Sequence, residues 1–367
     1  MDAGEGLADW LRLTLIPGIG GETQRKLLAA FGLPETVFAA SPTALRQVIG
    51  DRQVTLLRDT DNAEAIARAL DWAATPGQCI LTLADADYPQ ALLEIPDPPS
   101  LLYVRGRVEL LNRPALAIVG SRHPTPQGLH NARQFSTALA ETGLCIVSGL
   151  ALGIDAAAHE GALDCNGDTI AVIGTGNDRI YPARNRELAI AIAERGCIIS
   201  EFPLGTPVAA ANFPRRNRLI SGLARGVLVV EASVDSGSLI TARLAAEQGR
   251  EVCAIPGSIH SPQSRGCHKL LKQGAKLVET AQDVLEELRL EIRLPPAAPA
   301  ADVAVPNEAP DEARVLALLG YDPCPLDTLV TLSGLTPEAL SVMLLRLELG
   351  GRIAALPGGR YQRLPSS

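Results

Sequence analysis

The sequence predicts an α/β protein with a doubly wound, mainly parallel sheet, flanked by an all-helical N-terminal domain and a C-terminal winged helix. Three observations support this fold class. Between residues 80 and 290, short apolar runs alternate with segments of helical periodicity. These runs are apolar at every position, as in parallel strands buried on both faces. Both flanks lack such runs, and the C-terminal flank ends in a hairpin pattern.

The N-terminal domain is predicted to span residues 1–75, as a SAM-like or helix-hairpin-helix domain. A glycine-rich turn at residues 16–21 separates two segments of helical periodicity. The amides of such a turn can face a phosphate, and Arg25 and Lys26 follow it. Many acidic residues surround the turn. A turn that only packs the two helices is therefore the preferred interpretation, with an anion site as the alternative.

The α/β domain is predicted to span residues 76–290. Its apolar runs alternate with helical segments, which predicts crossover connections and a parallel sheet with helices on both faces. Most of the runs end in glycine or serine. The six runs are residues 116–120, 145–149, 169–174, 197–200, 227–231 and 251–255.

Two segments follow the α/β domain. Residues 291–310 are rich in proline and alanine and predict an extended linker. Residues 311–367 predict a winged helix, from three helical patterns and two strands around a turn at residues 357–359. Thr336 is the expected N-cap of the third helix, with Pro337 at its first position. The helical patterns cover residues 311–319, 326–333 and 337–349.

The third helix of this unit occupies the place of a DNA-reading helix. Between Thr336 and Gly350 its only basic residue is Arg346, against Glu338 and Glu348. Duplex binding needs several phosphate contacts. We therefore predict that the winged helix is a protein-contact or regulatory module.

Composition narrows the possible classes of protein. The chain has 367 residues and a formal net charge of −8, so it has no general attraction for polyanions. It has neither a signal-peptide pattern nor an apolar run of membrane-spanning length, and no membrane partner is expected. Seven cysteines without a C-x-x-C pair indicate reduced thiols and a cytoplasmic location. The five histidines make no zinc spacing, so no metal is predicted.

Loops rich in glycine and serine follow the predicted strands. Ligands of open parallel sheets bind beyond the carboxyl ends of the strands, where such loops meet. Small residues let backbone amides approach an anion, and helix N-termini add partial positive charge. The predicted binding residues of these loops are Gly120, Ser121 and Arg122, then Ser148 and Gly149, and then Ser236, Gly237 and Ser238.

The cluster of arginines at residues 215–218 is the most informative stretch of this acidic chain. Arginine carries a permanent charge and a planar donor fork that matches phosphate oxygens. No acidic residue occurs in residues 214–224, so we predict a polyanion site in preference to ion pairs with neighbouring acids. Pro214 favours a helix start here, with Arg215 and Arg218 on one face. The predicted site residues are Phe213, whose ring offers a face for a base, Arg215, Arg216, Asn217 and Arg218.

The fingerprints of nucleotide cofactors are missing. The first strand leads into Gly120-Ser121-Arg122 rather than G-x-G-x-x-G, and no P-loop sequence occurs. No cofactor is therefore predicted. Asp155 and His159 lie four residues apart and are expected to share a helical face, but no nucleophile or metal cluster accompanies them. A structural hydrogen bond is the preferred interpretation over an acid-base pair.

Taken in order, the central motifs resemble those of the DNA-processing protein A family, DprA, also called Smf. The resemblance runs from about residue 88 to residue 275. Each piece alone is weak, but the ordered set is specific. The pieces are I-V-G-S-R at 118–122, S-G-L-A at 148–151, G-I-D at 153–155 with His159, Tyr181-Pro182, Ser200-Glu201, F-P-R-R-N-R at 213–218, S-G-S-L-I-T-A at 236–242 and Pro256-Gly257.

The resemblance implies a non-enzymatic protein that binds single-stranded DNA in an extended Rossmann-like domain. It implies loading of the RecA recombinase onto that DNA, in natural transformation and recombination, and a homodimer formed through the Rossmann-like domain. It assigns the DNA pocket to Arg122, Phe213 and the arginine cluster, with the glycine and serine loops around them. Many members carry a lysine just before F-P-x-R-N-R. Residues 208–212 contain none, so this contact is either missing or supplied by another arginine, such as Arg184 or Arg225.

Two other functions stay open at the level of the sequence. Related folds include nucleotide-cleaving phosphoribohydrolases, although their P-G-G-x-G-T loop and its catalytic glutamate are absent here. Turnover of nucleoside monophosphates would support that enzyme. A scaffold that binds only proteins is the third possibility, and failure to bind any oligonucleotide would favour it.

Overall fold

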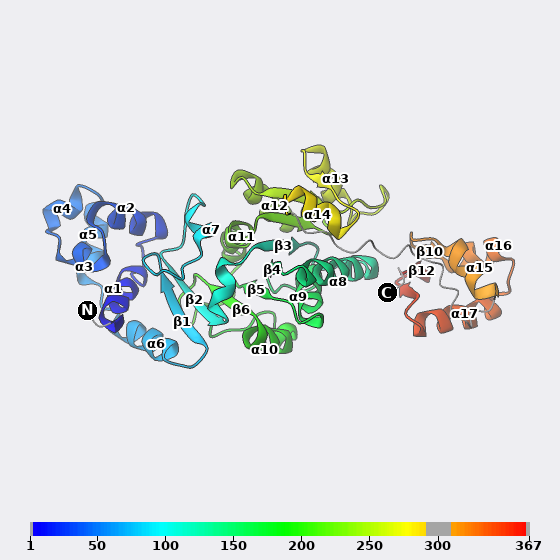
Figure 1. The fold of residues 1–367 in the computed structure, drawn as a ribbon, viewed down its shortest axis with the longest axis horizontal. Coiled ribbons are helices and arrows are strands. Elements are labelled where there is room, and N and C mark those ends of the chain that lie inside the picture. The colour runs from blue at the N-terminus through cyan, green and yellow to red at the C-terminus, as the bar shows by residue number, and fades with distance from the viewer. Residues whose placement is uncertain (1–2, 291–309, 365–367) are drawn as a thin grey trace.

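The computed structural model describes residues 3–290 and 310–364. Three bodies follow one another along the longest axis: a helical unit at the N-terminal end, a central sheet covered by helices, and a small unit at the C-terminal end (Figure 1). The predicted fold class is confirmed. The predicted linker lies outside the described residues, except for position 310, where a helix begins.

The N-terminal unit has a core of its own, made by the apolar faces of its helices. Ile16 and Ile19 of the glycine-rich turn are buried in this core, which favours the packing role of the turn. Ser41 caps α4 by accepting a hydrogen bond from the Ala44 amide at 3.2 Å. In the described residues the helices before the first strand are α1 (Ala3–Thr14), α2 (Gly21–Phe31), α3 (Pro34–Ala39), α4 (Pro42–Arg46), α5 (Asp51–Asp59) and α6 (Ala63–Ala73).

The central sheet has the strand order β1-β2-β6-β5-β4-β3-β7-β8-β9 in the described part of the chain. The strands from β6 to β9 in this order are parallel, whereas β2 pairs antiparallel with both β1 and β6. All six predicted runs are strands, β3 to β8. The strands are β1 (Gln78–Thr82), β2 (Leu101–Gly106), β3 (Ala115–Val119), β4 (Cys145–Ser148), β5 (Thr169–Val172), β6 (Cys197–Ser200), β7 (Gly226–Val229), β8 (Glu251–Ala254) and β9 (Lys276–Leu277).

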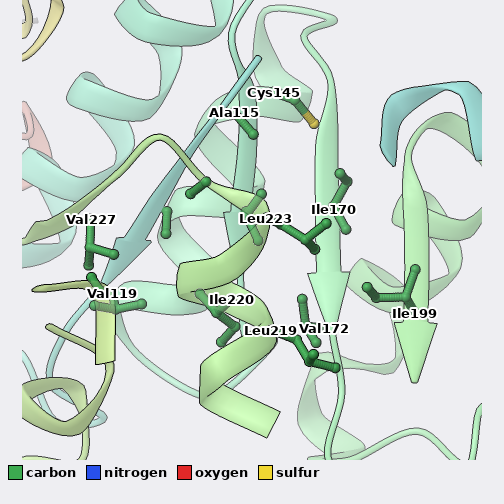
Figure 2. Close-up of a cluster of buried hydrophobic side chains, with 14 of the residues drawn as sticks. Ala115, Val119, Cys145, Ile170, Val172, Ile199, Leu219, Ile220, Leu223 and Val227 are labelled. Atoms are coloured by element: carbon green, nitrogen blue, oxygen red, sulfur yellow. The ribbon is translucent and has the colours of Figure 1, made fainter. Parts of the chain in front are cut away.

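Helices cover both faces of the sheet because alternate strand residues point to opposite faces. Ala117 and Val119 of β3 pack against α7, α11, α12 and α13, and Figure 2 shows α11 lying across this face. Leu116 and Ile118 of the same strand pack against α8, α9 and α14. The helices are α7 (Gln90–Leu93), α8 (Pro126–Glu141), α9 (Ile154–Asp164), α10 (Arg186–Arg195), α11 (Asn212–Leu223), α12 (Ser238–Glu247), α13 (Arg265–Lys272) and α14 (Ala281–Glu287).

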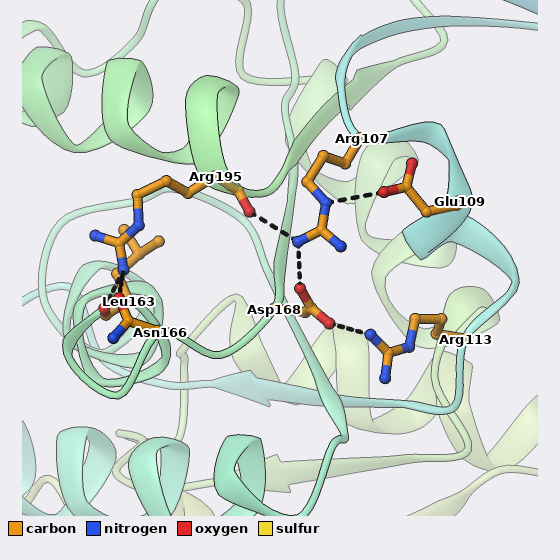
Figure 3. Close-up of polar contacts among 7 residues, drawn as sticks. All are labelled: Arg107, Glu109, Arg113, Leu163, Asn166, Asp168 and Arg195. Carbon is orange, nitrogen blue, oxygen red and sulfur yellow. Dashed lines mark hydrogen bonds and ion pairs between the residues drawn. The ribbon is translucent and has the colours of Figure 1, made fainter.

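Ion pairs join the segments at the amino ends of the parallel strands (Figure 3). Asp168, just before β5, accepts a hydrogen bond from Arg107 Nη1 at 2.6 Å and also pairs with Arg113, just before β3. Arg107 Nε in turn donates to Glu109 at 2.9 Å. Asp168 is thus held by two arginines. These ion pairs connect the segments at this edge of the sheet and stabilise the fold.

The N-terminal helices rest on the antiparallel extension formed by β1 and β2. Trp10 and Leu11 of α1 pack with Ile80 of β1 and Tyr103 of β2. The Trp72 ring meets the Tyr103 ring edge to face, with 5.6 Å between the centroids and 70° between the planes. The boundary predicted at residues 75 and 76 falls between α6 and β1, and this apolar packing crosses it.

The C-terminal unit contains the helices and strands expected of a winged helix, around a separate apolar core. Thr336 caps the third helix by accepting a hydrogen bond from the Ala339 amide at 3.3 Å. One contact to the central domain is the hydrogen bond from Gln362 Nε2 to Gln127 Oε1, at 2.8 Å. The elements are α15 (Pro310–Leu319), β10 (Cys324–Pro325), α16 (Leu326–Ser333), α17 (Pro337–Leu349), β11 (Ile353–Leu356) and β12 (Arg360–Arg363).

Candidate nucleic-acid interface

A cavity of 510 Å³ opens at the carboxyl ends of the parallel strands. It lies where the chain from β3 turns to β4 on one side and β7 continues the sheet on the other, which is the switch point of the topology. Ligands of doubly wound sheets bind at such a point. Of the predicted site residues, the cavity wall contains Gly120, Ser121, Arg122, Phe213, Arg216, Asn217, Ser236, Gly237 and Ser238.

The loop after β3 is held firmly by neighbouring backbone. The Ser121 amide donates to Glu231 O at 2.7 Å, and Ser121 O accepts from the Ile154 amide at 3.1 Å. A Cβ atom on Gly120 would lie 2.7 Å from Ile154 Cγ1. The glycine at position 120 is therefore required by packing as well as by any close ligand, and the loop presents Arg122 from a rigid base.

Arg122 is a cation of the cleft wall with no ion pair among the described residues. Its guanidinium carbon lies 5.3 Å from the centroid of the Phe213 ring, a cation–π contact. Among the described residues, no carboxylate lies within ion-pair distance of this side chain. Its charge is thus available to a ligand.

Arg216 lies at the bottom of the cleft with only 4 % of its surface exposed. Its Nη1 donates to Gly149 O at 2.6 Å and also to Val172 O, so it joins the ends of β4 and β5. The carboxylate of Asp155 balances its charge and accepts from the Gly149 amide at 3.1 Å. Burial lowers the pKa of Arg216 to about 10 and raises the pKa of Asp155.

Arg215 and Arg218 lie on one face of α11, as expected, but they point away from the cavity that holds Arg216. Both meet the buried carboxylate of Glu201, which is 3.5 Å from Arg215 Nη2 and also pairs with Arg218 Nη2. Arg218 Nε lies 3.1 Å from Asp97. The expectation that these arginines lack acidic partners is wrong, because the partners come from other segments of the chain. Helix α11 begins at Asn212 rather than at Pro214.

The loop before α12 forms the opposite wall of the cleft. The Ser236 and Ser238 hydroxyls lie 2.7 Å apart, and the Ser238 amide donates to Ser236 Oγ at 3.3 Å. No atom lies within 4 Å of the place where a Cβ of Gly237 would sit. This wall is therefore open to a ligand at the N-terminus of a ten-residue helix.

Ser148, like Arg215 and Arg218, is a predicted site residue that does not line the cleft. Its side chain is fully buried, and its hydroxyl donates to Ile118 O at 2.6 Å. Gly149 lines only a smaller cavity, where its carbonyl is occupied by Arg216. Both residues shape the loop after β4.

Asp155 and His159 both make hydrogen bonds within the fold, in agreement with the preferred interpretation of a structural hydrogen bond. His159 Nδ1 lies 2.7 Å from Thr169 Oγ1, and that hydroxyl donates to Ile146 O. Nδ1 must therefore carry the proton, which leaves Nε2 without a hydrogen. Burial lowers the pKa of His159 to about 3, helped by the charge of Arg216. Within the described ranges, no group of three or more potential metal ligands occurs.

The two arginines named in place of the missing lysine lie in different parts of the central domain, and neither lines the cleft. Ala210, within the segment that lacks a lysine, lines the cleft. Arg225 immediately precedes β7, and its amide bonds to Ala115 O at the amino ends of the strands, so it lies at the opposite edge. Arg184 lies in the short helix η2 (Ala183–Asn185), and neighbouring Asn185 donates to Leu150 O at 2.9 Å beside the cleft.

In the described chain no single helix is long and apolar enough to cross a membrane. The bent pair α16 and α17 meets the criteria of length and composition only when both helices are taken together.

The fold and the cleft define a class: a doubly wound α/β protein with an arginine- and glycine-lined cleft at its switch point. Comparison with known proteins identifies the family within this class. Residues 79–289 match the family described as DNA recombination-mediator protein A, and residues 295–359 match the DprA winged helix domain. The chain therefore belongs to the DprA/Smf family of DNA-processing proteins.

Several relatives cover most of the chain. Protein Smf of Escherichia coli is 40 % identical over 364 residues, which is 97 % of this chain and 95 % of that protein. DNA processing protein DprA of Streptococcus pneumoniae is 50 % identical over 206 residues, 56 % of this chain and 73 % of that protein. The crystal structure of the pneumococcal protein superposes with a TM-score of 0.67 at 38 % identity, covering 77 % of this chain and 97 % of that one.

A second solved structure is described by its binding of single-stranded DNA. It is DNA processing protein A of Helicobacter pylori, which superposes with a TM-score of 0.52 at 34 % identity. The match covers 57 % of this chain and 95 % of that chain. A DNA-processing role in recombination follows for this chain from its family.

Proposed function

We propose that this chain binds single-stranded DNA in the cleft at the switch point and loads the RecA recombinase onto it. One observation carries the proposal: Arg122, without a carboxylate partner among the described residues, stands over Phe213 at the carboxyl edge of the sheet. An arginine beside an aromatic ring matches a phosphate next to a base. The single-stranded DNA bound by the Helicobacter relative supports this choice of polyanion.

The binding residues proposed within the cleft have different tasks. Arg122 contacts phosphate, Phe213 supports a base, and the Gly237 amide, with the Ser236 and Ser238 hydroxyls beside it, faces the backbone of the strand. Arg216 and Asn217 form the floor. Arg215, half exposed beside the buried Glu201, extends the positive surface along α11. Arg218, already paired with two acids, holds α11 in place.

The protein is proposed to act by binding rather than by catalysis, as a homodimer formed through the Rossmann-like domain, in the cytoplasm. Natural transformation and recombination are the proposed processes. The winged helix is proposed to contact protein, because its core is separate from the cleft. Light scattering of the purified chain at several concentrations tests the dimer. A mass that stays monomeric throughout rejects it.

A binding titration tests the central proposal. The full chain is titrated against single- and double-stranded oligonucleotides at several salt concentrations, with RecA assembly on the single strand followed in parallel. We expect single-strand binding that weakens with salt, and faster RecA assembly when the chain is present. No single-strand binding at low salt rejects the whole proposal, whereas binding without faster assembly rejects only the loading role.

A further inference from the structure

A second, smaller cavity adjoins the cleft at Phe213. Its volume is 220 Å³, and Arg122, Phe213 and Arg216 line both cavities. The residues that line only the second cavity include Tyr181, which follows β5 in the chain and was not among the predicted binding residues. The two cavities therefore adjoin through shared side chains.

The two aromatic rings form one apolar wall of this second cavity. The centroids of Tyr181 and Phe213 are 6.0 Å apart, and their planes are inclined by 38°. Phe213 is held from behind, because a Cβ on Gly174 would lie 3.1 Å from its Cδ1. Asn212 Nδ2 also donates to Gly174 O at 3.0 Å, which ties the start of α11 to this loop. Phe213 thus has a firm support, with Tyr181 beside it.

Tyr181 is the ring with an accessible surface. It is 44 % exposed, although an aromatic side chain gains from burial. Phe213 is only partly exposed, and the Arg122 guanidinium occupies a place over its ring. Among the described residues, the Tyr181 hydroxyl has no hydrogen-bond partner. The Tyr181 ring is thus accessible to a ligand, and its hydroxyl makes no hydrogen bond to the described residues.

We propose that this second cavity takes a nucleobase, stacked on Tyr181, from a nucleotide adjacent to the one that Arg122 holds. The inference rests on the proposed function and adds a base site to it. In the wall, Thr175 Oγ1 donates to Arg179 O and Arg216 Nη1 donates to two carbonyls, while Arg216 Nε has no hydrogen-bond partner among the described residues. Stacking without directed donors accepts any base.

The experiment compares Tyr181→Ala, Tyr181→Phe and a matched control. Tyr321→Ala is the control, because Tyr321 in the C-terminal unit is 48 % exposed. The probes are oligodeoxythymidine and an abasic oligonucleotide of the same length, which keeps the phosphates and lacks the bases. We expect Tyr181→Ala to weaken oligodeoxythymidine binding roughly five-fold or more, with Tyr181→Phe and Tyr321→Ala close to the parent chain.

Two further readouts separate stacking from a general structural effect. The salt slope of log affinity is expected to stay unchanged in Tyr181→Ala, because no phosphate contact is lost. The loss is expected to vanish with the abasic strand. Tyr181→Trp is expected to bind oligodeoxythymidine with quenching of its added fluorescence, and to show no quenching with the abasic strand.

The outcomes distinguish this inference from the proposed function. Equal affinity of Tyr181→Ala and the parent chain for oligodeoxythymidine overturns the base site, as does an equal loss on the abasic strand. In both cases binding by the parent chain leaves the proposed function standing. A parent chain that binds neither strand overturns the proposed function, and the base site with it.

Discussion

At the scale of single residues, the arginine cluster contains side chains of two kinds. Arg216 and Arg218 are buried: Arg216 Nη1 donates to two carbonyls and Arg218 pairs with Glu201, while Arg216 Nε and Arg218 Nη1 have no hydrogen-bond partner among the described residues. Arg122, far from them in the sequence, lacks an ion pair among the described residues. A buried charge that loses its partner is costly, so the buried pair maintains the shape of the cleft. The charge offered to DNA in the cleft comes from Arg122, and half-exposed Arg215 lies outside the cleft, paired with Glu201.

Replacing Arg122 by alanine is expected to weaken single-strand binding and to lower the salt slope of log affinity by about 0.7, since one phosphate contact is lost. Arg243→Ala is the control, because Arg243 does not line the cleft and pairs with the exposed Glu247 of the same helix, α12. Titration at four salt concentrations measures both slopes. An unchanged slope in Arg122→Ala contradicts the assignment.

His159 makes the unfolding free energy depend on pH. Its pKa is lowered to about 3 in the fold, so only the unfolded chain takes up its proton as the pH falls below 6.5. Stability from this group is therefore complete above pH 6.5 and is lost between pH 6.5 and 3, by about 2 kcal/mol at pH 5. His159→Gln is expected to lack this loss.

Urea unfolding at pH 7.5 and pH 5 measures the difference between parent and variant. The buried carboxyls of Asp155, Glu201 and Glu231 have raised pKa values, so they favour the fold as the pH falls, with the opposite sign. They are present in both proteins and cancel in the comparison. Equal pH dependence of the two proteins contradicts the role given to His159.

At the scale of elements, the glycine loops divide into packed and open positions. A Cβ on Gly149 would lie 2.2 Å from Arg216 Nη1, whereas Gly237 has no atom within 4 Å. From the sequence alone, both glycines are predicted to let the backbone approach an anion closely. In the structure, only Gly237 has room for a ligand, because the place beside Gly149 is filled by a side chain from α11.

Gly149→Ala and Gly237→Ala form a matched pair that tests this division. Gly149→Ala is expected to lower the melting temperature, because Arg216 must move away from two carbonyls that it bonds. Gly237→Ala is expected to change the unfolding free energy by less than about 0.5 kcal/mol and to weaken single-strand binding. Thermal unfolding measures the stability of both variants, and a titration with a single-stranded oligonucleotide measures their affinity. Parent-like affinity in Gly237→Ala removes the loop before α12 from the interface.

At the scale of the whole molecule, the N-terminal helices and the C-terminal unit differ in how closely their apolar cores join the central domain. The N-terminal helices share an apolar contact with β1 and β2, whereas the C-terminal unit has its own core. Helix α17 also exposes apolar side chains: Val342 at 54 %, Leu345 at 56 % and Leu349 at 81 %. Such a face suits protein contact better than phosphate, in agreement with the role proposed for this unit.

Ending the chain after Leu290 is expected to leave single-strand affinity within about two-fold, because the residues of the cleft lie between positions 119 and 263. The same titration measures it. The separate C-terminal segment, beginning at Pro310, is expected to leave duplex DNA unshifted at moderate salt. A ten-fold loss of affinity on truncation, or a duplex shift by the segment, contradicts the proposed division of tasks.

The α/β class, the six strands β3 to β8 and the winged helix could be predicted from the amino-acid sequence, because they depend on local periodicity and capping. The sequence did not indicate β1, β2 or β9: the first two form an antiparallel extension, and β9 has only two residues. Folding in three dimensions determines which arginines have acidic partners and which ring lies beside Phe213. Helix α11 is contacted by side chains from distant parts of the sequence. Its arginines interact with three carboxylates and its Phe213 with one ring, from Asp97, Asp155, Glu201 and Tyr181. Ion pairs and ring contacts depend on the distances between side chains in the folded protein. A local sequence pattern does not predict the distance between residues that are far apart in the chain.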